Sequence, residues 1–173
     1  MSTNAGNSMA IIMTVLVTIV MWITAIVGTI AIALIGMSII AHYSDGSIQI
    51  LNLLIEDKTF SISALIAGFL GALIVIPAII YVCFQLRRIL ATLSDGDPFV
   101  PENARRLRFI AIAIALTQLL TILIQLATPV MFKEATISPR IDLIAWASVA
   151  ALFILSQVFR EGTRLRDEEK MTI

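Results

Sequence analysis

The chain has 173 residues, of which 59% are hydrophobic and 14% are charged, and its twelve basic residues balance twelve acidic ones. This composition lies far from that of soluble domains and excludes an ordinary water-soluble fold. The absence of net charge excludes a general attraction to nucleic acid, so we expect no direct nucleic-acid partner. One histidine and one cysteine cannot supply a metal site or an intrachain disulfide, and we expect no metal, no cofactor and no enzymatic activity.

Four long stretches of the sequence contain no charged residue. Each is about long enough for a helix rising about 1.5 Å per residue to cross a hydrocarbon layer about 30 Å thick. We therefore predict an all-α integral membrane protein, a four-helix bundle that forms a single domain over residues 1–173. The predicted spans are residues 9–41, 61–86, 109–132 and 143–159.

The first predicted span is the longest, so it must tilt, protrude from the bilayer or break at a glycine such as Gly28. Ala25, Thr29 and Ala33 form a row of small residues at four-residue spacing, which would allow another helix to approach closely. We expect this row to pack within one subunit, with a homo-oligomer interface as the alternative. The outer connection, residues 42–60, fits either a short interfacial helix or a strand.

Basic residues fall mainly on one side of the predicted membrane. The connection between spans two and three contains five arginines, and the segment after span four contains three arginines and a lysine. The other two connections contain only Lys58, Lys133 and Arg140. Because Lys and Arg are retained on the cytoplasmic side, both termini are predicted to be cytoplasmic. The first span is too long for the apolar part of a signal peptide, so we expect it to be retained.

The connection between spans two and three, residues 87–108, predicts a cytoplasmic helical hairpin. Span two continues as a helix beyond the bilayer, and residues 94–98 (Ser-Asp-Gly-Asp-Pro) have the chemistry of a turn. A second helix is predicted to begin near Pro101, with Glu102 at its positive end. Glu102 and Arg106 are spaced for an ion pair one helical turn apart.

The C-terminal tail, residues 160–173, places arginines near the membrane and acids beyond them. Gly162 is predicted to end the fourth helix in a left-handed cap. The acids at 167–169 are placed to meet the hairpin arginines. Leu165, Met171 and Ile173 are apolar residues in a charged segment, which predicts docking onto the hairpin or onto another protein, with a disordered tail as the alternative.

Polar residues inside the third span lie on one face. Gln118, Thr121 and Gln125 follow each other at i, i+3 and i+7. Neutral amides at such positions form hydrogen bonds to neighbouring helices, and in a transporter they line a polar pathway. Both interpretations remain open at this point.

Both cytoplasmic segments carry a resemblance to a known family. The residues concerned are Ile89-Leu90, Gly96-Asp97-Pro98-Phe99 and Glu102-Asn103-Ala104-Arg105-Arg106-Leu107-Arg108 in the hairpin, and Phe159, Gly162, Leu165, Asp167 and Thr172-Ile173 at the end of the chain. This pattern resembles the YoaS-like family of bacterial four-span membrane proteins of unknown function. The resemblance implies a bacterial cytoplasmic (inner) membrane. Members are often encoded beside a small helix-turn-helix regulator, which implies such a regulator as a cytoplasmic partner.

The predicted function is therefore that of a non-enzymatic membrane anchor or sensor whose hairpin and tail bind a soluble partner. The alternative is a small transporter or accessory membrane subunit that uses the polar face of span three. The candidate partner-binding residues are Asp97, Pro98, Phe99, Glu102, Asn103, Arg105, Arg106, Arg108, Gly162, Leu165, Asp167 and Ile173.

Overall fold

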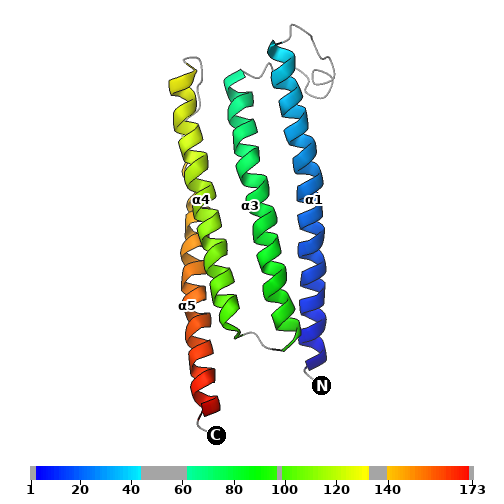
Figure 1. Ribbon diagram of the computed structural model, residues 1–173, viewed down its shortest axis with the longest axis vertical. Helices are drawn as coiled ribbons and strands as arrows, with labels where there is room; N and C mark the ends of the chain where they lie inside the picture. The colour runs from blue at the N-terminus through cyan, green and yellow to red at the C-terminus, as the bar shows by residue number, and fades with distance from the viewer. Residues whose placement is uncertain (1–2, 44–61, 97–98, 133–139, 172–173) are drawn as a thin grey trace.

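A computed structural model of the chain describes residues 3–43, 62–96, 99–132 and 140–171. These residues form four helices (Figure 1), namely α1 (Thr3–Tyr43), α3 (Ile62–Ser94), α4 (Pro101–Met131) and α5 (Leu143–Met171). All four are long and apolar enough to cross a membrane, which confirms the predicted all-α, multi-pass membrane class. Most of the outer connection lies outside the described residues.

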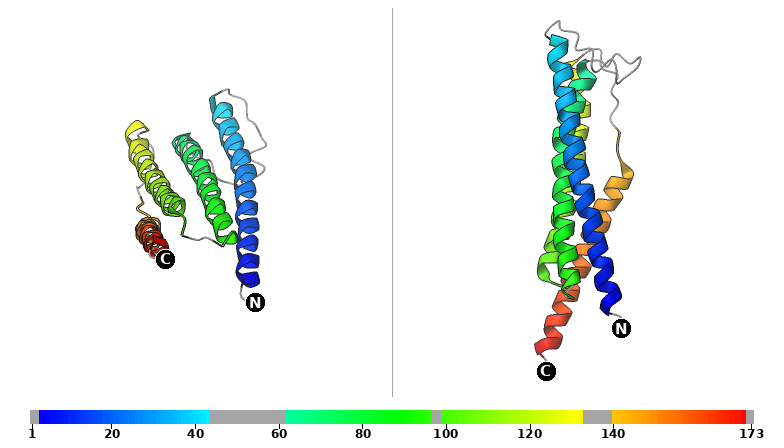
Figure 2. Two further views of the ribbon diagram at one scale, coloured as in Figure 1. Left: turned by 60° about the horizontal axis from the view of Figure 1, so that its bottom comes forward. Right: turned by 90° about the vertical axis from the view of Figure 1, so that its right-hand side faces the viewer.

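The helices pack in chain order rather than around a common centre. The main contacts join α1 to α3, α3 to α4, and α4 to α5. The left-hand view of Figure 2 shows α1, α3 and α4 in a row, with α5 against α4 and off the line of the other three. Each helix therefore leaves long apolar faces uncovered by the other described residues, and these are the faces that a bilayer would cover.

The long helix α1 does not break. It runs without interruption from Thr3 to Tyr43 and packs on α3 where Gly28 faces Ile76. A Cβ atom on Gly28 would lie 2.8 Å from Cγ2 of Ile76, so glycine permits this close approach. Thr29 and Ala33, from the predicted small-residue row, are exposed, so the expected packing of that row within the subunit is wrong at these two positions.

The predicted hairpin between spans two and three is present. Helix α3 continues beyond residue 86 to Ser94, and α4 begins at Pro101. Gly96 follows α3 with φ of 80°, and its N–H donates to the carbonyl oxygen of Leu93 at 3.2 Å. A residue with a side chain would be strained at this φ, so Gly96 is the glycine that ends a helix here.

The predicted cap at Gly162 is wrong. Helix α5 continues through this position to Met171, and its C-terminal part projects past the turn between α3 and α4 (Figure 1). The glycine serves a tertiary contact instead, described below.

The most tightly packed part of the molecule lies where α3, α4 and α5 meet near that turn. Ile89, Leu107 and Ile110 form its buried core, and Leu152 and Phe159 of α5 pack against it. We call this part of the molecule the hairpin end, and it holds the candidate functional site.

Candidate functional site

Asn103 joins the two arms of the hairpin. Its side chain has 0% exposure, and its Nδ2 donates to Oγ1 of Thr92 in α3 at 2.6 Å. Its Oδ1 accepts a hydrogen bond of 2.9 Å from Nη1 of Arg106, which also donates to the carbonyl oxygen of Arg88 at 3.1 Å. The Thr92 hydroxyl in turn donates to the carbonyl oxygen of Ile89. Buried polar groups need such partners, so this network fixes α4 against α3.

This network changes the roles predicted for two candidate residues. Asn103 has no exposed surface on which a partner could bind, and Arg106 is half-buried and directed at Asn103 and the α3 backbone. The predicted ion pair between Glu102 and Arg106 is therefore not formed. Glu102 stands exposed in the first turn of α4, where a negative charge favours the helix end.

Phe99 connects the hairpin to α5. Its ring lies against Gly162, where an added Cβ would be 2.8 Å from Cδ1 of the ring. The ring also packs at a tilt on Phe159, with 5.7 Å between the two centroids. The hydroxyl of Thr163 donates to the carbonyl oxygens of Phe99 at 3.1 Å and of Phe159 at 2.9 Å. A side chain and a backbone group of the turn are thus both held by one face of α5.

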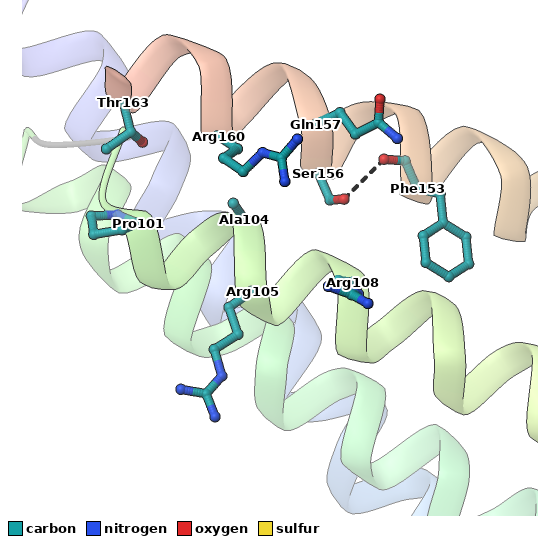
Figure 3. Close-up of a pocket in the computed structure, with 9 residues that line it drawn as sticks. All are labelled: Pro101, Ala104, Arg105, Arg108, Phe153, Ser156, Gln157, Arg160 and Thr163. Carbon is teal, nitrogen blue, oxygen red and sulfur yellow. Dashed lines mark hydrogen bonds between the residues drawn. The ribbon is translucent and has the colours of Figure 1, made fainter. Parts of the chain in front are cut away.

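A cavity of about 570 Å³ lies between α4 and α5 beside this contact (Figure 3). Its charged lining residues are three arginines, and none of the described residues that line it is acidic. Figure 3 shows Arg160 reaching from α5 toward Ala104 and Arg108 lying along the α4 wall, whereas Arg105 turns away from α5. The guanidinium of Arg105 lies 5.3 Å from the centroid of the Phe109 ring, a cation–π arrangement. The lining residues are Pro101, Ala104, Arg105, Arg108, Phe153, Ser156, Gln157, Arg160 and Thr163.

Residues 52–173 match the model of a family described as Protein of unknown function (DUF2975). The chain belongs to the DUF2975 family. No curated protein and no solved structure gives a match to it. The family match covers α3, α4 and α5 and leaves out α1, so every residue of the hairpin network, the Phe99 contact and the cavity lies inside the DUF2975 region.

The acids of the DUF2975 C-terminal helix do not meet the hairpin arginines as predicted. Nη2 of Arg164 lies 2.6 Å from Oε1 of Glu161, and its Nε lies 3.6 Å from Oε1 of Glu168. Nε of Arg166 lies 3.7 Å from Oδ1 of Asp167. These pairs all run along α5. The two pairs of Arg164 are three and four residues apart, a spacing that supports a helix.

The exposed apolar residues of the tail that the structure describes do not dock onto the hairpin. Leu165 is 54% exposed and Met171 is 81% exposed, while the contact with the hairpin is made by Phe99. Asp97, Pro98 and Ile173, which were also predicted to bind a partner, lie outside the described residues.

The polar face of α4 has a partly structural role in this DUF2975 chain. Oε1 of Gln125 accepts a hydrogen bond of 2.8 Å from the backbone N–H of Arg140, just before α5. The hydroxyl of Thr121 donates to the carbonyl oxygen of Thr117 within α4. Gln118 is half-buried. One of the three residues thus makes a tertiary bond, to the segment that leads into the last helix.

The sequence prediction missed Thr92, Thr163 and Gln85. The first two are hydroxyl residues in helices, and their partners are known only once the turn is folded. Gln85 is 7% exposed, donates to the Tyr81 hydroxyl at 2.9 Å and has a buried Oε1 without a partner. An amide at the end of a long apolar stretch, one turn after a tyrosine, was the available signal for it.

Proposed function

We propose that this protein is a non-enzymatic membrane anchor or sensor that binds a soluble protein through the hairpin turn and the C-terminal part of α5 together. The observation that carries this proposal is the contact of Phe99 with Gly162 and Thr163. It joins the two segments predicted to bind a partner into one surface. A change in the packing of the spans would reach that surface through the same contact.

The C-terminal part of α5 offers the surface that a partner would use. It projects past the turn, and its local charge pairs hold a helix there (Figure 1). Leu165 is an exposed apolar side chain among charged ones, with Asp167 also exposed. Interfaces commonly bury such an apolar residue at their centre within a polar rim.

The proposed location is the bacterial cytoplasmic membrane, with this surface in the cytoplasm. Figure 1 places the described ends of the chain and the turn between α3 and α4 at the same end of the molecule. That end carries most of the basic residues, which are retained on the cytoplasmic side. The resemblance to the YoaS-like family supports a helix-turn-helix regulator as the soluble partner.

The transporter or accessory-subunit alternative has less support. Gln125 is engaged by the backbone of Arg140, and Thr121 is engaged by its own helix. These bonds take up groups that a polar pathway would need to leave free.

The proposal is tested by affinity purification of the full chain in gentle detergent, with a tag at the N-terminus and identification of co-purifying proteins by mass spectrometry. We expect a small DNA-binding protein to be recovered with the unaltered chain. Leu165→Ala should reduce that recovery about tenfold, as expected for the loss of a central interface side chain. Glu169→Ala is the matched control, because it shortens another exposed side chain of the same helix. Equal recovery with Leu165→Ala, or recovery of no soluble protein, contradicts the proposal.

A further inference from the structure

The cavity between α4 and α5 is built from two facing helix surfaces. Pro101, Ala104, Arg105 and Arg108 are spaced at i, i+3, i+4 and i+7 on α4, and Phe153, Ser156, Gln157 and Arg160 have the same spacing on α5. Residues so spaced share one side of a helix. Small side chains at Ala104 and Ser156 leave the volume of about 570 Å³ between the two surfaces, which is within the range of ligand pockets.

No described acidic residue neutralises the charge in this cavity. Arg105, Arg108 and Arg160 line it, and none of them forms an ion pair with the described residues. Glu102 and Glu161 are the acids nearest to these arginines in the sequence, and neither lines the cavity. Glu102 is exposed, and Glu161 is paired with Arg164. Arginines placed together without acids attract an anion, and the guanidinium group binds phosphate oxygens in pairs.

The position of the cavity along the helices indicates that its ligand has an apolar part as well as a negative charge. Arg108 and Arg160 stand where the uncharged stretches of α4 and α5 begin and end, at residues 109–132 and 143–159. The cavity continues to Phe153, which lies within the apolar stretch of α5. A ligand that fills it would meet arginines at the polar end and apolar side chains at the other. Basic pockets between membrane helices at headgroup level bind anionic lipids in this way.

We propose that this cavity binds the phosphate headgroup of an anionic phospholipid. Arg108 and Arg160 supply the charge-assisted hydrogen bonds, and Arg105 adds its field from outside the gap (Figure 3). An acyl chain lies along the apolar faces of α4 and α5 beyond Phe153. This site is independent of the soluble partner proposed above, because its ligand and its residues are different from Leu165 and the projecting part of α5.

The test uses the full chain purified in detergent and mixed with phosphatidylglycerol, with phosphatidylcholine of the same acyl chains, or with inorganic phosphate. Bound lipid is counted by native mass spectrometry. We expect phosphatidylglycerol to be retained at least about tenfold better than phosphatidylcholine. We expect millimolar inorganic phosphate not to displace it, since free phosphate lacks the apolar contacts. Retention of both lipids alike, or displacement by inorganic phosphate, overturns a phospholipid site.

Two double variants separate a built site from general attraction between arginines and headgroups. Arg108→Gln with Arg160→Gln should lower phosphatidylglycerol retention about tenfold. Arg87→Gln with Arg88→Gln removes the same charge from α3 at the same end, outside the cavity lining, and should leave retention unchanged. Equal loss in both variants overturns the proposal.

A third variant keeps every arginine and fills the cavity instead, so that any loss of bound lipid does not come from a change of charge. Ala104→Leu places a larger side chain in the gap opposite Arg160 and should also displace the lipid. A stable Ala104→Leu protein that retains phosphatidylglycerol as before contradicts the assignment.

Discussion

The ring of Phe99 lies so close to Gly162 that a single added carbon on the glycine would come within 2.8 Å of it. Phe99 belongs to the turn after α3, and Gly162 belongs to α5 at the level where this helix passes the turn. Glycine at 162 is thus required by a tertiary contact, since the backbone there is helical and any residue could adopt it. This contact sets the position of the turn on the last helix.

We predict that Gly162→Leu lowers the free energy of unfolding by about 1–3 kcal/mol, because an overpacked contact forces the ring or the helix to move. Thermal unfolding of the purified protein in detergent measures the effect. Gly68→Leu is the matched control, because a Cβ added to this helical glycine of α3 meets nothing within 4 Å, and this variant should not lose stability. Adding Phe99→Ala should remove most of the penalty of Gly162→Leu. Additive losses in the double variant would show that the two residues do not interact.

The hydrogen bonds of Asn103 give a second prediction. Asn103→Ala removes this partner from the half-buried Thr92 hydroxyl and Arg106 guanidinium, at a cost of about 1–3 kcal/mol. Gln118→Ala truncates a half-buried amide of the same helix and should cost less. Thermal unfolding again provides the measurement.

A double-mutant cycle that combines Asn103→Ala with Thr92→Val isolates the hydrogen bond between these two side chains. Because Thr92 and Asn103 bond directly, the double variant should lose less than the sum of the two single variants. If the losses were additive, the bond between the two side chains would not contribute to stability.

Local signals explain which parts of the fold were predictable. Pro101 at the first helical position, Glu102 after it and the turn residues at 94–98 act within a few positions of each other, and α4 begins where they indicate. The spans were predictable for the same reason, since an uncharged stretch of sufficient length is a property of one segment.

Contacts between distant segments explain the errors. The cap predicted at Gly162 followed the common role of glycine at helix ends, but the space beside this glycine is taken by Phe99, 63 positions earlier in the chain (162 − 99). Asn103 was predicted to be a binding residue because it belongs to the hairpin pattern that resembles the YoaS-like family. Its burial depends on how α3 packs beside α4, which no local pattern encodes.

The packing of α1 gives a third prediction. Gly28→Leu would push against Ile76, whose Cγ2 lies 2.8 Å from an added Cβ, and should loosen α1 from α3. We expect a loss of about 1–3 kcal/mol that Ile76→Ala largely restores. Gly71→Leu, on α3 where nothing lies within 4 Å of an added Cβ, controls for the larger side chain. A Gly28→Leu protein that unfolds like the unaltered chain would contradict the close approach of the two helices.

The orientation of the protein in the membrane can be measured by labelling single cysteines. The chain has one cysteine, Cys83, so Cys83→Ala gives a background free of thiols. On that background, Asp95→Cys and Leu165→Cys label positions at the hairpin end, and Met131→Cys labels the last residue of α4, at the opposite end. All three positions are exposed in the described structure.

In intact cells treated with a membrane-impermeant maleimide, only Met131→Cys should react, because the arginine-rich end is predicted to be cytoplasmic. Asp95→Cys and Leu165→Cys should react only after lysis. The reverse pattern would contradict the proposed orientation and move the Leu165 surface away from any cytoplasmic partner. Labelling of Asp95→Cys and Leu165→Cys from opposite sides would contradict the contact between the turn and α5 as well, because Phe99 and Gly162 could not then lie together.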